Sequence, residues 1–165
     1  MRSKRRSLGI LSLFAALAIL LTASFAFAEE EVTRDSYREA VEPICKTNKQ
    51  ASDRILSGVK DMVKKDKLAQ ASQAFAKAAT ALEKAQKQLA AVAQPPADAA
   101  KLTKWISEIK GEVALMKTIS TKFKQGNKSK ATSLAVKLQN NANKANNLVI
   151  AFQFNYCKID PSKYS

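Results

Sequence analysis

Apolar residues recur at alternating intervals of three and four residues over most of the chain. The clearest run spans residues 68–92 and consists of Leu68, Ala71, Phe75, Ala78, Leu82, Ala85, Leu89 and Val92. This spacing places its members on one face of an α-helix, in the pattern of helices that pack into a bundle. No segment shows the period of two that is typical of a β-strand. The chain is therefore predicted to be all-helical.

Three further segments repeat this rhythm, over residues 37–62, 102–123 and 131–152. Pro43 lies inside the first, where we expect it to kink or restart the helix. Pro95-Pro96 ends the run over 68–92, because neither proline can continue the hydrogen-bond ladder. Four such helices with short connections predict an up-down-up-down four-helix bundle. A helical solenoid is the weaker alternative.

Helix ends are marked by residues with suitable capping chemistry. Asp66 and Asp98 stand where the N-caps of the second and third helices are expected. Gly126 suits the left-handed position that closes a helix, and Asn127 or Ser129 is expected to cap the fourth.

Residues 1–28 have the pattern of a signal peptide. A start with four basic residues precedes an apolar run over 8–21, and Ala26 and Ala28 offer the small side chains that a signal peptidase recognises. Cleavage would leave residues 29–165 as the bundle domain. The alternative is an uncleaved membrane anchor, since the apolar stretch over 8–28 is long enough to span a bilayer. Both readings place the domain outside the cytoplasm, secreted or in the cell envelope.

Cys45 and Cys157 are the two cysteines of the chain. In an exported protein two cysteines most simply form a disulfide. Cys45 lies near the start of the first helix and Cys157 just past the fourth, and these ends meet in an up-down-up-down bundle. We expect a structural bridge; a redox pair is the less favoured reading, because there is no C-x-x-C turn.

Positive charge is concentrated toward the C-terminus. The chain holds 28 Lys and Arg against 14 Asp and Glu, but residues 113–165 hold nine Lys and one acid, Asp160. The candidate anion-binding face comprises Lys117, Lys122, Lys124, Lys128, Lys130, Lys137 and Lys144. The partners it predicts are anionic cell-wall polymers or lipid head groups, with a merely solvated surface as the alternative. Nucleic acid is not expected, because export and the lack of interleaved aromatic residues argue against it.

The residue types needed for catalysis are scarce. The chain has no His, which removes the usual general base and the commonest metal ligand. Seven acids show no interior placement that would pair them as general acid and base: Glu39, Glu42, Asp53, Asp61, Glu83, Glu108 and Glu112. We predict a non-enzymatic protein with no catalytic, cofactor or metal site.

A few residues stand out on the helical faces. Asn48 and Asn141 fall on apolar stripes, where they are expected to fix helix register, or else to line a ligand cavity. Trp105, the one tryptophan, is expected in the core or a half-buried seam. Asn140, Asn143, Asn146 and Asn147 are interpreted as a solvated face of the fourth helix.

Several of these features together resemble a known group of proteins. They are the segment 37–45 ending in Cys45, Pro95-Pro96 leading into Trp105, Phe123 before Gly126, and an Ala-rich last helix ending near Cys157. This pattern resembles uncharacterised, exported, all-helical proteins of actinobacteria with one N-terminal and one C-terminal Cys. The resemblance implies a helical bundle closed by a terminal disulfide, and it carries no activity or binding residues. The tail over 155–161 is longer and more aromatic than the resemblance implies.

Two functional hypotheses follow. In the first, an exported non-enzymatic domain binds anionic cell-envelope polymers through its basic face. In the alternative, the bundle shelters a small apolar ligand or a client peptide, for which the many Ala of the second and fourth helices leave room. The sequence does not indicate an oligomeric state.

Overall fold

The computed structural model describes residues 31–160, and all regular elements of this part of the chain are helices, with no strand. The signal peptide or anchor expected over residues 1–28 lies outside the described residues. The elements, in chain order, are α1 (Arg34–Ile55), α2 (Val59–Lys64), α3 (Leu68–Ala90), the 3-10 turn η1 (Pro96–Asp98), α4 (Ala99–Lys124), α5 (Lys128–Leu148) and the 3-10 turn η2 (Ile150–Phe152). The prediction of an all-helical chain built on four long helices, α1, α3, α4 and α5, is confirmed.

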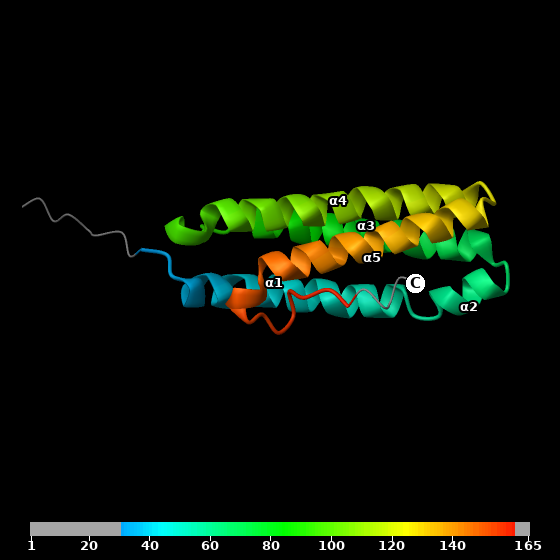
Figure 1. The fold of residues 1–165 in the computed structure, drawn as a ribbon. Coiled ribbons are helices and arrows are strands. Elements are labelled where there is room, and N and C mark those ends of the chain that lie inside the picture. Colours follow the sequence, from blue (N-terminus) through cyan, green and yellow to red (C-terminus); the bar gives the residue numbers. More distant parts are fainter. Residues whose placement is uncertain (1–30, 161–165) are drawn as a thin grey trace, which may run out of the picture. The chain divides into compact units, whose positions relative to one another are not determined.

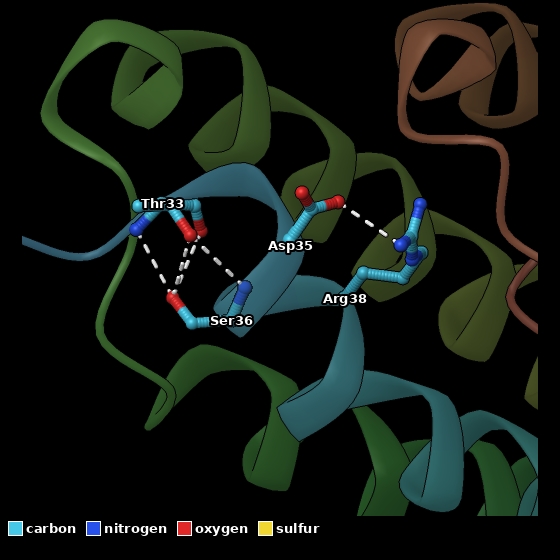
Figure 2. Close-up of polar contacts among 4 residues, drawn as sticks. All are labelled: Thr33, Asp35, Ser36 and Arg38. Atoms are coloured by element: carbon cyan, nitrogen blue, oxygen red, sulfur yellow. Dashed lines mark hydrogen bonds and ion pairs between the residues drawn. The ribbon is translucent and has the colours of Figure 1, made fainter.

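Helix α1 begins at a reciprocal cap. The Thr33 hydroxyl accepts a hydrogen bond from the Ser36 N–H at 3.1 Å, and the Ser36 hydroxyl accepts one from the Thr33 N–H at 3.0 Å (Figure 2). Asp35 in the first turn forms an ion pair with Arg38 at 3.0 Å, also drawn in Figure 2. The two hydrogen bonds between Thr33 and Ser36 satisfy N–H groups that a helix start leaves without partners.

The first helical segment is interrupted at a different place from the one predicted. Helix α1 continues through Pro43 without restarting, and it ends at Ile55. The break falls at Gly58, which has a left-handed φ of 74° and begins the short helix α2. Glycine adopts this conformation without the steric cost that a side chain would add, so it interrupts the helix more effectively than Pro43 does.

Two of the predicted caps have other roles. Asp66 is not the N-cap of α3; it has a φ of 54°, and its carboxylate binds Lys128 at 2.6 Å. Asp98 does occupy the N-cap position of α4, but its carboxylate binds the Arg34 guanidinium instead of the helix start. The prediction for the last turn is confirmed, since Gly126 has a φ of 72° and the Asn127 side chain accepts from the Lys130 N–H.

The long helices pack in chain order, α1 on α3, α3 on α4 and α4 on α5 (Figure 1). Consecutive long helices run in opposite directions, as the colours of Figure 1 show. Their facing sides form one apolar core, which includes Phe75 of α3, Met116 of α4 and Leu138 of α5. Within residues 31–160, α1 and α5 are not closely packed on each other. The seam between them is closed differently.

Residues 153–160, called here the C-terminal segment, close the α1/α5 seam. Cys157 forms a disulfide with Cys45 of α1, as the sequence analysis expects. The Glu42 carboxylate of α1 accepts hydrogen bonds from the N–H groups of Asn155 and Tyr156. On the other side, the Asn146 amide of α5 donates to the Ile159 carbonyl at 2.8 Å and accepts from the Ile159 N–H at 2.9 Å. The interpretation of Asn146 as part of a solvated face is therefore wrong. Its side chain anchors this segment to α5.

Aromatic rings extend this closure into the core. Phe154 packs against Trp105 with ring centroids 5.6 Å apart, and Phe152 packs against both Phe154 and Tyr37. Trp105 is 1% exposed, so the expectation of a core position is confirmed. No helix in the described part of the chain is both long enough and apolar enough to cross a membrane.

Candidate functional site

Three of the predicted lysines form a line on α5. Lys130, Lys137 and Lys144 are all exposed, and none of their ammonium groups makes a hydrogen bond or ion pair with the described residues. A spacing of seven residues leaves them on one helix face, about 10.5 Å apart along the axis. Helix α5 itself contains no acidic residue. This face of α5 therefore presents positive charge that no residue of its own helix neutralises.

Helix α4 adds two lysines beside this line. A Cβ on Gly111 would lie 3.4 Å from the Asn141 side chain of α5, which shows that Gly111 faces α5. Lys104 and Lys122 lie seven residues before and eleven residues after Gly111, so each is within about 20° of its direction around the helix. We call the set of Lys104, Lys122, Lys130, Lys137 and Lys144 the α4/α5 lysine stripe.

The other predicted lysines do not join the stripe. Lys117 turns toward α3, where its ammonium group binds the Glu83 carboxylate at 2.7 Å and lowers the pKa of that carboxyl group. Lys128 binds Asp66 in the turn before α3. Lys124 is exposed, but it lies seven residues after Lys117 and therefore on the α3 side of α4. The structure thus separates the predicted face into two groups. The stripe makes no ion pair within residues 31–160, although the Lys122 ammonium group donates a hydrogen bond to the Gln125 side chain at 3.0 Å.

A buried carboxyl group lies beneath the stripe, so one of the seven acids singled out in the sequence is in the interior. Glu112 of α4 has no exposed surface. The pKa of Glu112 is raised to about 8, mainly by burial; the hydrogen bond from Asn141 lowers it in part, and the nearby charge of Glu108 adds to the rise. At pH 7 the group is therefore mainly neutral, and it does not cancel the positive charge of the stripe.

The spacing of buried residues in α4 indicates that Glu112 lies on the buried face of the helix. It belongs to a strict alternation of four and three residues that contains Trp105, Ile109, Glu112, Met116, Ile119 and Phe123. All six are buried. The sequence analysis does not predict the burial of Glu112, because a glutamate is expected on the solvent side of a helix.

Asn141 holds α4 and α5 in register, as one of the two interpretations of the interior asparagines expects. Its amide donates to the Glu108 carbonyl at 2.9 Å and approaches a Glu112 carboxyl oxygen at 3.5 Å. Asn48 of α1 is different, because its buried Oδ1 atom has no donor among the described residues.

Within residues 31–160, no cluster of three or more His, Cys, Asp or Glu side chains could hold a metal ion. Neither a protein-family model nor a curated protein nor a solved structure matches the chain. The α4/α5 lysine stripe is consequently the surface from which a function can be argued.

Proposed function

We propose that this chain is an exported, non-enzymatic four-helix bundle of up-down-up-down topology that binds linear phosphate-bearing polymers of the cell envelope. The observation that carries the proposal is the line of Lys130, Lys137 and Lys144, exposed and unpaired on a helix without acids. The disulfide between Cys45 and Cys157 supports export, because such bonds persist in oxidising compartments. The same features support membership in the actinobacterial group that the sequence resembles.

The shape of the stripe favours an extended polymer. Its α5 lysines repeat every 10.5 Å or so along a straight helix, so a linear polyanion can meet each of them in turn. Because the ammonium groups are in solvent, each contributes about 1 kcal/mol at most next to an anionic surface, and this contribution is screened by salt. The binding that we propose is therefore multivalent, weak at each contact and sensitive to ionic strength.

The test is sedimentation or calorimetric titration of the full chain with inorganic polyphosphate at increasing salt concentration. We expect the triple variant Lys130→Gln, Lys137→Gln and Lys144→Gln to bind about 100-fold more weakly at low salt, as three lost contacts of this size imply. Vesicles of phosphatidylglycerol, used as a second probe, show whether a lipid surface replaces the polymer.

A matched control removes the same charge from another surface. Lys60, Lys64 and Lys77 are exposed on α2 and α3, and none is paired within the described part of the chain. Changing these three lysines to Gln gives the same net charge as the stripe variant. Equal weakening by both triple variants, or binding that does not change with salt, would show that net charge or another surface is responsible.

A further inference from the structure

The interior of the bundle contains a small cavity whose lining residues include two with unpartnered buried polar atoms. It lies between α1, α3, α4 and the C-terminal segment, beside the disulfide. The Trp105 Nε1–H has no acceptor, and Asn48 Oδ1 has no donor, among the described residues. Both residues line this cavity. It is separate from the α4/α5 lysine stripe, which lies on the outer side of α4 and α5.

These two atoms differ from ordinary polar groups in a core. A buried donor or acceptor without a partner costs about 1–3 kcal/mol, and native structures contain few of them. Trp105 is 1% exposed, so its N–H is closed off from bulk solvent. The cavity therefore presents one donor and one acceptor, each of which gains by meeting a complementary group.

The remaining walls are apolar. Leu82, Ala85 and Leu89 of α3 and Ile109 of α4 enclose the cavity, and Tyr156 and Ile159 of the C-terminal segment cover it. The space open to the centre of a water molecule is about 30 Å³. An adjoining pocket of about 40 Å³ shares Asn48, Tyr156 and Ile159 with it and leads toward the surface. On this measure one water needs about 10–15 Å³, so each space suits a molecule of a few non-hydrogen atoms.

We propose that this cavity is a binding site for a small neutral molecule with a hydroxyl group, such as a short alcohol. A hydroxyl oxygen accepts from the Trp105 N–H while its hydrogen is donated to Asn48 Oδ1, so one group satisfies both orphan atoms. The apolar walls take up the short alkyl part. A hydrocarbon of the same size would leave both polar atoms unsatisfied, and an ion would lose its hydration without gaining an opposite charge.

The experiment uses the full chain and a pair of isomeric probes. 1-Propanol and methoxyethane have the same atoms, but the ether accepts a hydrogen bond and cannot donate one. Trp105 is the only tryptophan, so its indole ¹H–¹⁵N resonance reports occupancy directly. We expect a saturable shift of this resonance, with the alcohol binding about tenfold more tightly than the ether, as one additional hydrogen bond implies.

A variant separates the acceptor from the cavity. Asn48→Leu retains the approximate size of the side chain and removes Oδ1, so the preference for alcohol over ether should fall to about one. If this variant does not fold, the ratio of the affinities for 1-propanol and methoxyethane, measured on the unchanged chain, still tests the proposal. Equal affinity for the two isomers, a preference that survives Asn48→Leu, or an indole resonance that no probe shifts saturably would overturn the proposal; in the last case the cavity takes only water.

Discussion

The two seams that flank α5 are closed in opposite ways. At the α4/α5 seam two helices pack directly, with Gly111 allowing Asn141 to approach the α4 backbone. At the α1/α5 seam the C-terminal segment lies between the helices and is held by a disulfide and by side chains that bind its backbone. The first seam is continuous apolar packing with a charged outer edge. The second depends on a few discrete anchors.

This difference separates two ways of joining helices. Direct packing distributes its stabilisation over many apolar contacts, each of them small. A segment without helical structure has backbone N–H and C=O groups to satisfy, and here Glu42 and Asn146 supply partners. The α1/α5 seam should therefore be sensitive to single substitutions. The α4/α5 seam should tolerate surface changes and respond mainly to changes in its buried polar pair.

Removing the disulfide should have the largest effect on stability, and the α1/α5 seam should be the first part of the bundle to open. The bond closes a loop of 113 residues, counting both cysteines. The chain-entropy account gives such a closure about 5 kcal/mol at most. We expect Cys45→Ala with Cys157→Ala to lower the free energy of unfolding by about 3–5 kcal/mol in denaturant titrations. Amide exchange at Ile159 should then be faster than at Leu138 of α5, because Leu138 lies in the core and exchanges only when the whole bundle unfolds. A loss below about 1 kcal/mol, or exchange at Ile159 no faster than at Leu138, would contradict the contrast between the seams.

Glu112 makes the directly packed seam sensitive to pH. Its pKa is about 8 in the fold against a usual 4.5, so between these values the folded state retains a proton that the unfolded chain releases. This contribution to stability is complete below pH 4.5 and is lost as the pH rises through 8. The linkage amounts to about 1.4 kcal/mol per pH unit, or about 3 kcal/mol by pH 7.

Glu112→Gln should remove this dependence. The variant keeps the shape of a neutral carboxyl group, so its stability should match the unchanged chain near pH 4 and exceed it by about 3 kcal/mol at pH 7. Thermal unfolding across this pH range measures the difference. Glu39→Gln, on the exposed side of α1, is the control and should leave the slope unchanged. Parallel pH curves for the unchanged chain and Glu112→Gln would show that Glu112 titrates normally.

Asn146 tests the polar anchoring of the C-terminal segment without breaking a covalent bond. Its amide makes two hydrogen bonds to the backbone of Ile159. Asn146→Ala leaves both backbone groups without this partner, and we expect a loss of about 1–2 kcal/mol. Asn143→Ala is matched to it, since Asn143 is exposed on the same helix and has no partner among the described residues. The two variants can be compared by denaturant unfolding; equal stability of the two would remove Asn146 from the anchors.

The sequence predicted the helical part of this molecule well because apolar spacing is a local signal. The rhythm over residues 68–92 corresponds to α3, and Trp105 lies in the core as its neighbours imply. The disulfide was also predictable, because exported chains with two cysteines rarely leave them free. The burial of Glu112 could also be predicted from this spacing. A glutamate that is assumed to be charged at pH 7 is instead expected to face solvent.

The C-terminal segment could not be predicted in this way. It has no helical period, and its path depends on partners distant in sequence, such as Glu42 at one edge and Asn146 at the other. An asparagine that binds a remote backbone has the same local surroundings as one that faces solvent, as Asn146 and Asn143 show. The candidate binding face was predicted only in part, because the ion pairs that neutralise Lys117 and Lys128 involve acids of other elements.

The smallest expected effect on stability is that of the α4/α5 lysine stripe, and its smallness is informative. Lys130, Lys137 and Lys144 are exposed and make no ion pair within residues 31–160, so changing all three to Gln should alter the free energy of unfolding by less than about 0.5 kcal/mol. Denaturant titration at moderate salt measures this change. If the triple variant loses polyanion binding but keeps its stability, these lysines contribute to binding and not to folding. Destabilisation by more than about 1 kcal/mol would instead mean that the alkyl parts of these lysines cover the α4/α5 packing, and the contrast between a charged edge and a self-sufficient core would fail.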